Sequence, residues 1–430
     1  MKYSGWIKFA RLPIALATLL LGIGCSALPG FNKRLPGNRA FIKYWPPEAN
    51  SNRLRLAVKD NIDMKGVVTT AGSELFLRTH APAQKDAACL AIARQRNVQI
   101  VGKTNLAEFA IAPSGMNQFF GTPRNPLRRN LIPGGSSSGN AVAVASGMAD
   151  VAFGTDTAGS IRVPAACCGI VGLKTTRGLI SIDGVYPVEP ELLDTVGPMA
   201  KDIAGTVAGM DLLQAGFAAK YAAAKAAKPS ASSIRVGRLR LTGTDPKVDA
   251  AIDDALAKTG FQVVQLDDQF REKWDDAKRD GTTVASAGAW ITDERLQFAL
   301  AVSSRTKSII RVGQLNYTTA YRGAIARQRD WQRVLGNIFE KVDFIALPTL
   351  QTRPPGLPLF DLNVGILDAL VVQIQNTTPV NFAGNPALAM PIPIHDRKIP
   401  VTSLQLVGSP LAEANLLNAG RLVEAAVKSR

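Results

Sequence analysis

Apolar residues recur along the chain in two patterns, short runs typical of strands and longer stretches with helical spacing. Leu54, Leu56 and Val58 alternate with other residues and predict a strand that ends at Lys59. The stretch 86–96 places Ala, Leu and Ile on one face of a predicted helix. Further strands are predicted at 98–101, 151–153, 170–173, 234–239, 261–266 and 342–347, and further helices at 139–147, 248–258 and 411–428. Short apolar strands separated by helices predict an α/β fold with a largely buried sheet.

The length of the chain and one change in composition bear on its domain organisation. A chain of 430 residues could form two or three domains, but large α/β folds of this size often form one body. The stretch 218–233 is rich in Ala and Lys and ends in Pro-Ser-Ala-Ser-Ser, which predicts a helix end and then a surface connection. The chain has no internal repeat of the length that solenoid proteins use.

The charge balance is strongly basic, with 50 Lys and Arg against 34 Asp and Glu and a formal net charge of +16. Proteins that bind nucleic acid or anionic membranes have this balance, and so do proteins with a solvated basic surface. Long runs of like charge are absent, so we expect a solvated surface and no nucleic-acid partner. Arg322, Arg329 and Arg333 are expected on the outer face of a helix, with Trp331 and Leu335 turned away from them.

Histidine and cysteine are too sparse for several kinds of site. The two histidines, His80 and His395, rule out a metal site built on several imidazoles. The four cysteines form neither C-x-x-C pairs nor a spaced framework, so we expect no zinc site, no disulfide scaffold and no metal or cofactor. Cys167 and Cys168 lie in an apolar run and are expected to pack as small hydrophobic residues.

Residues 1–27 resemble an export signal. Lys2, Lys8 and Arg11 precede an uncharged stretch at 12–24, and small residues follow around Cys25 and Ala27. The uncharged stretch is short for a membrane span. We therefore expect an exported bacterial protein, either cleaved after Ala27 and periplasmic, or lipidated at Cys25 and attached to the periplasmic side of the membrane.

Three segments combine small residues with isolated polar or charged ones, and they are the candidates for chemistry. They are Ala57-Val58-Lys59-Asp60-Asn61-Ile62-Asp63, Pro133-Gly134-Gly135-Ser136-Ser137-Ser138-Gly139, and Gly154-Thr155-Asp156-Thr157-Ala158-Gly159-Ser160-Ile161-Arg162-Val163-Pro164. Small residues let backbone N–H groups approach a ligand, as in a phosphate cradle or an oxyanion hole. Nucleotide binding is disfavoured, because Gly102-Lys103-Thr104 ends like a Walker A loop but Asn97 stands where that loop begins with Gly.

The second segment also matches G-x-S-x-G, the nucleophile elbow of α/β-hydrolases, with Ser137 as nucleophile. Asp361 or Asp368 and His395 would supply the other members of that triad in the expected chain order. The elbow requires a strand directly before the turn, whereas Pro133-Gly134 predicts a loop there. This arrangement is therefore an alternative and not our main interpretation.

Together the three segments resemble the amidase signature family, with that family's spacing from Gly134 to Pro164. Four other segments are similar to stretches of the same family: Lys59–Asp63, Gly102–Phe109, Asp194–Met199 and Thr378–Ala387. The resemblance covers about residues 54–425 and is weak from 218 to 342. It implies one amidase domain at 50–425 with a variable middle region, and a large mixed sheet with helices on both faces.

By this resemblance Ser160 is the nucleophile, Ser136 follows a cis peptide and bridges the proton transfer, and Lys59 is the base. Burial lowers the pKa of a lysine and makes it a usable base at neutral pH. The N–H groups of Thr157, Ala158, Gly159 and Ser160 would form the oxyanion hole. Ser137, Asp156 and Arg162 would shape the surrounding loops.

Some positions depart from the family's pattern, and the resemblance leaves the substrate open. Ala158 replaces the commoner Gly, which requires a negative φ there. The expected substrate is a small-molecule amide, cleaved at its C–N bond through an acyl-enzyme on Ser160; no oligomeric state is assigned. Pocket-lining residues are expected around 116–120, 185–192 and in the middle region. The family also contains the A subunit of the tRNA-dependent amidotransferase, which is the alternative from another functional class.

Overall fold

The computed structural model describes residues 37–48, 50–228, 230–358, 364–396 and 399–428. The expected export or lipid-attachment segment at 1–27 and Asp361 lie outside the described residues. The described residues from 37 onward belong to one compact unit. Within this part of the chain, no helix combines the length and the hydrophobicity needed to cross a bilayer.

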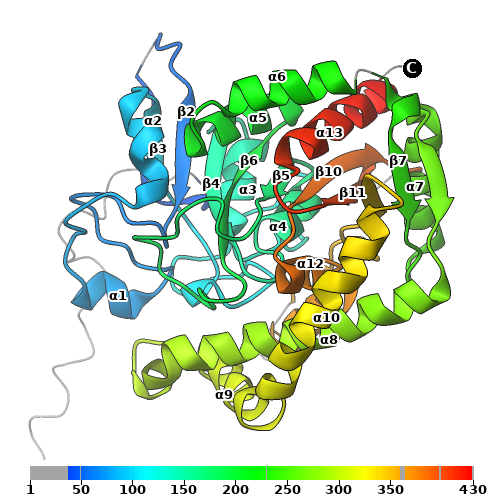
Figure 1. Ribbon diagram of the computed structural model, residues 1–430. Helices are drawn as coiled ribbons and strands as arrows, with labels where there is room; N and C mark the ends of the chain where they lie inside the picture. Colours follow the sequence, from blue (N-terminus) through cyan, green and yellow to red (C-terminus); the bar gives the residue numbers. More distant parts are fainter. Residues whose placement is uncertain (1–36, 49, 229, 359–363, 397–398, 429–430) are drawn as a thin grey trace, which may run out of the picture. The chain divides into compact units, whose positions relative to one another are not determined.

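The strands of the described residues pair into a single sheet, in the order β1-β3-β2-β4-β6-β5-β10-β11-β9-β7-β8 (Figure 1). β2 is parallel to both β3 and β4, and β7 is parallel to both β8 and β9, whereas the remaining pairs are antiparallel. The strands are β1 (Phe41–Tyr44), β2 (Arg55–Lys59), β3 (Gln99–Thr104), β4 (Val151–Asp156), β5 (Val171–Lys174), β6 (Thr195–Ala200), β7 (Arg235–Arg238), β8 (Gln262–Gln265), β9 (Phe344–Pro348), β10 (Ala387–Pro393) and β11 (Val401–Gly408). The predicted α/β class and mixed sheet are confirmed.

Helices cover both faces of the sheet. Successive strand residues point to opposite sides, so each strand contributes side chains to the core on both faces. In β2, Val58 packs into one hydrophobic cluster and its neighbour Ala57 into another. The first cluster is covered by α2 (Ala91–Gln95), α5 (Ile203–Leu213), α6 (Phe217–Ala227), α7 (Pro246–Thr259) and α13 (Glu413–Lys428). The opposite face is covered by α3 (Ser138–Ala145), α4 (Arg162–Cys168), α8 (Asp268–Asp293), α10 (Tyr321–Phe339), α11 (Val364–Ile374) and α12 (Thr378–Ala383).

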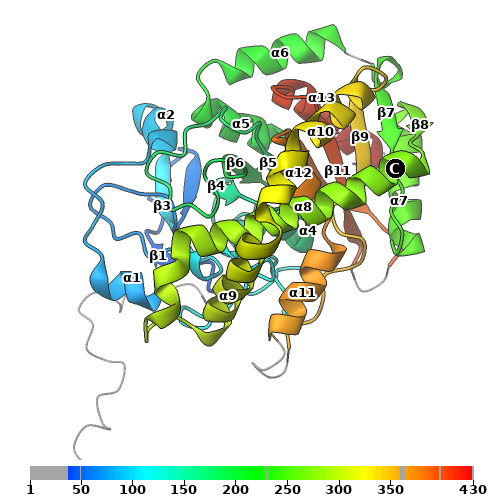
Figure 2. The same cartoon turned by 60° about the horizontal axis from the view of Figure 1, so that its bottom comes forward.

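Two further helices lie outside these layers. α1 (Glu74–Thr79) packs through Phe76 against Phe109 and Tyr186. α9 (Ser304–Thr319) packs along α8 (Figure 1). Figure 2 shows α11 at the same end of the structure as α8 and α9, and these three helices become the walls of the site.

The strands predicted from apolar runs are confirmed, with ends that differ by at most three residues from the predicted ones. The predicted helix at 248–258 is confirmed as α7, and the expected cap Gly260 follows its last residue in the left-handed region. The helix predicted at 86–96 is shorter. Asp86 accepts a hydrogen bond from the Lys65 N–H and Ala87 donates to the Asp63 carbonyl, so these residues are held by a neighbouring loop and the α-helix starts only at Ala91. The stretch 218–233 contains the end of the helix α6 at Ala227 and then a mainly exposed connection with the short 3-10 turn Ala231–Ser233, as predicted.

The charged face of α10 follows the prediction. Trp331 and Leu335 are buried, whereas Arg322, Arg329 and Arg333 are exposed. Cys167 and Cys168 are buried in α4, as expected for small hydrophobic residues.

Candidate active site

Lys59 is the last residue of β2 and is fully buried. The neighbouring parallel strand β4 pairs with β2 up to Val58 and Phe153, so the ends of both strands lie at the same edge of the sheet. There the Lys59 Nζ donates to the Ser136 Oγ and to the Thr155 Oγ1, each over 2.7 Å. The Asn61 Nδ2 also donates to the Thr155 Oγ1, over 3.2 Å. The Lys59 amine is therefore held between two hydroxyl groups.

Burial dominates the electrostatics of this amine. It lowers the pKa of Lys59 from 10.5 to about 7, although the charges of Asp156 and Asp194 favour the protonated form. Near neutral pH a substantial fraction of Lys59 is thus unprotonated and able to accept a proton.

The loop before α3 brings Ser136 to the amine. The peptide bond between Gly135 and Ser136 is cis, as the resemblance implies. The next residue ties this loop to the Ser160 turn, because the Ser137 N–H donates to the Ser160 carbonyl over 3.2 Å. Ser136 is buried, with an exposed fraction of 1%.

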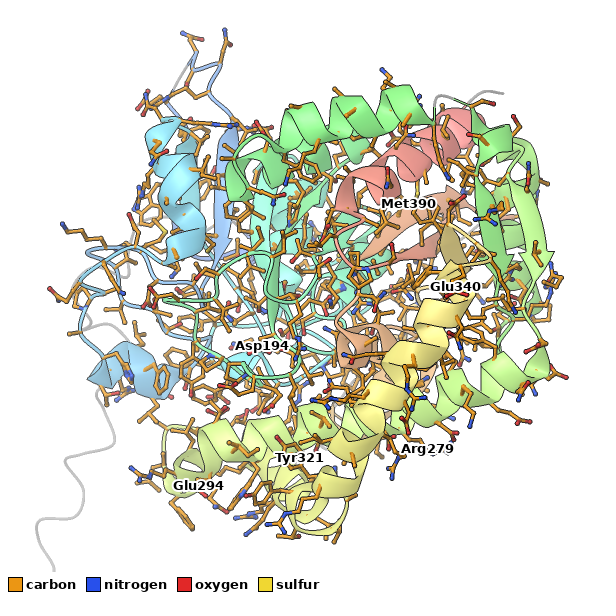
Figure 3. All side chains as sticks on the ribbon, in the orientation of Figure 1. Asp194, Arg279, Glu294, Tyr321, Glu340 and Met390 are labelled. Carbon is orange, nitrogen blue, oxygen red and sulfur yellow. The ribbon has the colours of Figure 1, made fainter. Side chains whose placement is uncertain are left out.

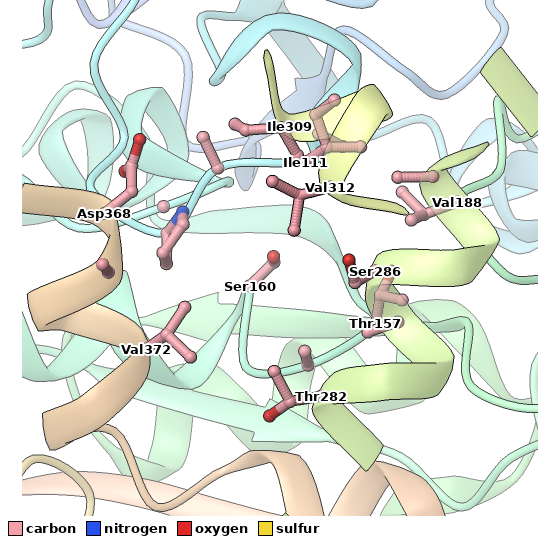
Figure 4. Close-up of a pocket in the computed structure, with 18 of the residues that line it drawn as sticks. Ile111, Thr157, Ser160, Val188, Thr282, Ser286, Ile309, Val312, Asp368 and Val372 are labelled. Atoms are coloured by element: carbon pink, nitrogen blue, oxygen red, sulfur yellow. The ribbon is translucent and has the colours of Figure 1, made fainter. Parts of the chain in front are cut away.

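Ser160 lies in the turn between β4 and α4 and is partly exposed. Its hydroxyl makes no hydrogen bond to any residue that the structure describes. Figure 4 shows this side chain pointing into a cavity. The geometry thus joins Lys59 to Ser136 directly and leaves the Ser160 hydroxyl without a hydrogen-bond partner among the described residues, directed into the cavity.

A buried ion pair shapes the turn that carries Ser160. The Asp156 carboxylate accepts from the Gly159 N–H over 2.7 Å, from the Ile161 N–H over 3.1 Å, and from the Arg162 guanidinium over 3.0 and 3.1 Å. Burial favours the neutral acid, but Arg162, Lys174 and a hydrogen bond from Asn381 outweigh burial and lower the pKa of Asp156 to about 2. The carboxylate is therefore charged and holds the turn closed.

The residues of the same turn line the cavity, and some of their backbone N–H groups have no partner in the described part of the chain. Those of Thr157, Ala158 and Ser160 have no hydrogen-bond acceptor among the described residues, whereas the Gly159 N–H is occupied by Asp156. Ala158 does not have a positive φ, so its methyl group is accommodated as required. Gly159 has φ 133°, and a Cβ there would lie 2.2 Å from the Thr377 Oγ1. This position therefore requires glycine.

Three residues that support the site were assigned no role from the sequence. The first is Asp194, which accepts from the Thr157 Oγ1 over 2.5 Å, and the second is Asn381, whose Nδ2 donates to the Asp156 carboxylate over 2.8 Å. Thr155 is the third, as the second hydroxyl on Lys59. All three lie in segments that resemble the family, but their roles depend on contacts between distant segments.

The cavity has a volume of about 730 Å³, and the turn contributes Thr157, Ala158, Gly159 and Ser160 to its lining. Its walls come from α8, α9, α11 and neighbouring loops and are mainly apolar, with side chains such as Ile111, Val188, Ile309, Val312 and Val372. Gln118 and Val188 lie in two of the loops expected to line the pocket, and α8 and α9 lie in the middle region, so those expectations are confirmed.

The charged side chains that line the cavity are Arg305 and Asp368, which neutralise each other. Arg305 donates to Asp368 through two nitrogens, each over 2.6 Å, and also to the Ser114 hydroxyl and the Met116 carbonyl. Most of the guanidinium hydrogens are thus used within the protein. The pair ties α9 to α11 and leaves little capacity to bind a charged ligand.

The alternative triad is not assembled. Ser137 is fully buried and its hydroxyl donates to the Thr155 carbonyl over 3.4 Å, whereas His395 is exposed. Asp368 is engaged by Arg305. Among the described residues, no group of three or more His, Cys, Asp or Glu side chains is arranged to hold a metal ion.

Comparison with known proteins places the chain in a family. Residues 54–417 match the family model described as Amidase, so the chain belongs to the amidase family, whose members include the amidase signature enzymes. It is 32% identical to the A subunit of the glutamyl-tRNA(Gln) amidotransferase of Halobacterium salinarum, over 86% of this chain and 94% of that one. It is 33% identical to the 2-amino-5-chloromuconic acid deaminase of Comamonas testosteroni, over 87% and 81% of the two chains.

A solved structure shows the same fold. A bacterial aryl acylamidase of the amidase signature family superposes with a TM-score of 0.74 at 18% identity, covering 87% of this chain and 82% of that one. The amidase signature fold is thus confirmed.

Proposed function

We propose that the protein hydrolyses the C–N bond of an amide through an acyl-enzyme on Ser160. The observation that carries the proposal is the hydrogen bond between the buried Lys59 amine and Ser136, beside a cavity into which Ser160 points. A serine hydroxyl becomes a strong nucleophile only when a base takes its proton. Lys59 is suited to that role because its pKa is lowered to about 7.

In the acylation step the Ser160 Oγ attacks the amide carbonyl and passes its proton to Ser136, which passes its own proton to neutral Lys59. The negative charge that develops on the carbonyl oxygen is stabilised by the N–H groups of Thr157, Ala158 and Ser160. The C–N bond then breaks, and the proton returns from Lys59 through Ser136 to the departing nitrogen. Water then attacks the ester on Ser160 and passes its proton through Ser136 to Lys59. The bond between the acyl carbon and the Ser160 Oγ breaks, the proton returns through Ser136 to that oxygen, and a carboxylic acid is released.

The cavity indicates the class of substrate. Its apolar walls favour an amide with an uncharged apolar group, since burial of apolar surface stabilises the complex. The self-neutralised Arg305–Asp368 pair makes an amino acid such as glutamine a poor fit. This preference argues against the amidotransferase alternative.

The test is hydrolysis of an uncharged medium-chain fatty amide and of glutamine by the full-length protein, with ammonia release as the readout. Lys59→Ala, Ser136→Ala and Ser160→Ala should each lower kcat by about 10²–10⁴-fold or more. His395→Ala is the control and should retain full activity. A preference for glutamine would favour the amidotransferase alternative, and loss of activity in His395→Ala alone would refute the lysine mechanism.

A further inference from the structure

Exposed apolar side chains lie on two of the helices that wall the cavity, α9 and α11, beside the residues that line it, and this side is taken as the mouth of the cavity. α9 and α11 each present a cavity-lining stripe and, next to it on the helix surface, an exposed apolar pair. On α9 the pair is Val312 and Leu315, which are 57% and 62% exposed. On α11 it is Ile366 and Leu370, which are 72% and 41% exposed. Residues three or four apart lie on the same side of a helix, so each pair forms one continuous strip.

The connection between α8 and α9 extends this surface. Phe298 and Leu300 are 79% and 99% exposed there. Leu300 lines a shallow groove with Phe119 and Arg305, which places the connection beside the α9 end of the cavity wall. We call Phe298, Leu300, Val312, Leu315, Ile366 and Leu370 the mouth patch. A soluble surface rarely leaves so many large apolar side chains together unless they meet a partner.

Basic side chains border the mouth patch. α9 contains Lys307 and Arg311 and no Asp or Glu, and Arg311 is one helical turn from Leu315 on the exposed side. Exposed Glu294 and exposed Arg295 begin the short 3-10 turn Glu294–Phe298 that follows α8 and leads to Phe298; Figure 3 labels Glu294. Two acidic residues, Glu74 and Glu108, line the groove beside Leu300, but Glu74 is paired with Arg78 and Glu108 accepts from Ser303 and Thr306. The charges that α9 adds to the patch are therefore basic, with Arg311 the exposed one.

This combination distinguishes between two occupants of the patch. A symmetric contact between two copies would bring equivalent surfaces together, with the basic side chains of α9 facing like charges, and would close the mouth of the cavity. A lipid surface with negative headgroups instead matches both features, because apolar side chains enter the interface while Lys and Arg contact the headgroups.

We propose that the mouth patch is a docking surface for an anionic lipid bilayer. It holds the mouth of the cavity against the lipid, where an apolar ligand dissolved in the bilayer enters without crossing water. The patch consists of residues between 298 and 370 and includes none of residues 1–27, so it orients the protein whether or not the N-terminal segment attaches it to a membrane. The docking does not depend on the proposed amide hydrolysis.

The test is a polarity-sensitive fluorophore (NBD) attached to single introduced cysteines in the full chain, in a Cys25→Ser background. Cys89, Cys167 and Cys168 are buried and serve as unreactive background. The labelled sites are Leu315→Cys and Ile366→Cys in the mouth patch. The matched control is Val264→Cys, which is 52% exposed on the edge strand β8 at the end of the sheet. Because each variant carries the same N-terminal segment, differences between labels report local insertion only.

With vesicles of equal parts phosphatidylglycerol and phosphatidylcholine, the two patch labels should shift to the blue and the Val264→Cys label should not. The shift should shrink with pure phosphatidylcholine and in an Arg311→Gln background. In a further variant the label is placed at Phe298→Cys, and Leu315 and Ile366 are both replaced with Ser. The lipid concentration that gives half of the blue shift should then rise at least about tenfold. Equal shifts at Val264→Cys, or no shift at the patch sites, would overturn the proposal. A blue shift without vesicles that grows with protein concentration would also overturn it, in favour of self-association.

Discussion

Replacement of Lys59 with Met should stabilise the protein, and by more at pH 7 than at pH 9. The pKa of Lys59 falls from its ordinary 10.5 to about 7 in the folded state because the amine is fully buried. The unfolded chain therefore binds more protons than the folded one between these values. As the pH falls from 10.5 toward 7, protonation of Lys59 in the unfolded chain lowers the free energy of unfolding. Met binds no proton, so the Lys59→Met variant does not lose stability in this way.

The size of the effect follows from the two pKa values. One pKa unit corresponds to about 1.36 kcal/mol, so burial of Lys59 costs about 4 kcal/mol at pH 7 and about 2 kcal/mol at pH 9. Met also removes the hydrogen bonds to Ser136 and Thr155, but that loss is the same at both pH values. The free energy of unfolding of Lys59→Met minus that of the wild type should thus fall by about 2 kcal/mol from pH 7 to pH 9.

Urea unfolding followed by tryptophan fluorescence at the two pH values measures this difference. A difference that does not change with pH would refute the reasoning, because Lys59 would then keep its proton in the folded state. Lys174 offers a matched comparison, since burial, with the charge of Arg162, also lowers its pKa to about 7. The Lys174→Met variant should show the same trend of stability with pH. A fluorophosphonate probe should still label Ser160 in the Lys174→Met variant but not in the Lys59→Met variant.

Three further predictions concern the turn and the relay. Amide hydrolysis measured as kcat/KM against pH should rise with an apparent pKa near 7, the value to which burial lowers Lys59, and a rise centred near 10 would contradict the assigned base. Arg162→Met leaves the buried Asp156 carboxylate without its cation and should lower the free energy of unfolding by about 3–5 kcal/mol in urea; an effect below about 1 kcal/mol would show that the pair does not hold the turn. Gly159→Ala places a Cβ against Thr377 and should reduce fluorophosphonate labelling of Ser160 at least about tenfold, by displacing the N–H groups of the turn; unchanged labelling would contradict that geometry.

The elements that carry Lys59, Ser136 and Ser160 are largely local, which is why the sequence alone predicted them. An alternating run ending at Lys59 and a small-residue segment before Ser160 specify a strand end and a turn without reference to the rest of the chain. The strands β6 and β10 were not predicted, because local patterns do not show which segments pair in the sheet. Gly197-Pro198 and Pro391-Ile-Pro suggest turns locally, but both strands are paired on each side within the sheet.

The details that tune the site depend on contacts between distant segments. The Gly159 N–H was expected in the oxyanion hole, yet in this structure it donates to Asp156, which leaves three free N–H groups in the turn. The partnership of Thr157 with Asp194, 37 residues apart, required the pairing of β4 with β6. The cavity walls from α8 and α9 were predicted only as a region, because that part of the chain carries little resemblance to the family and its helices were not resolved from the pattern. The contribution of α11 was not predicted, since this helix follows the middle region.

The most direct test of the central claim is to mix the protein with a p-nitrophenyl ester of a medium-chain fatty acid and to stop the reaction rapidly. Mass spectrometry of the proteolytic peptides then locates the acyl group. An acyl group added to the peptide that contains Ser160 is predicted in the wild type, and its formation should be strongly reduced in Lys59→Ala and Ser136→Ala. Hydrolysis that proceeds with no adduct on Ser160, or with the acyl group on the peptide that contains Ser137, would contradict the account.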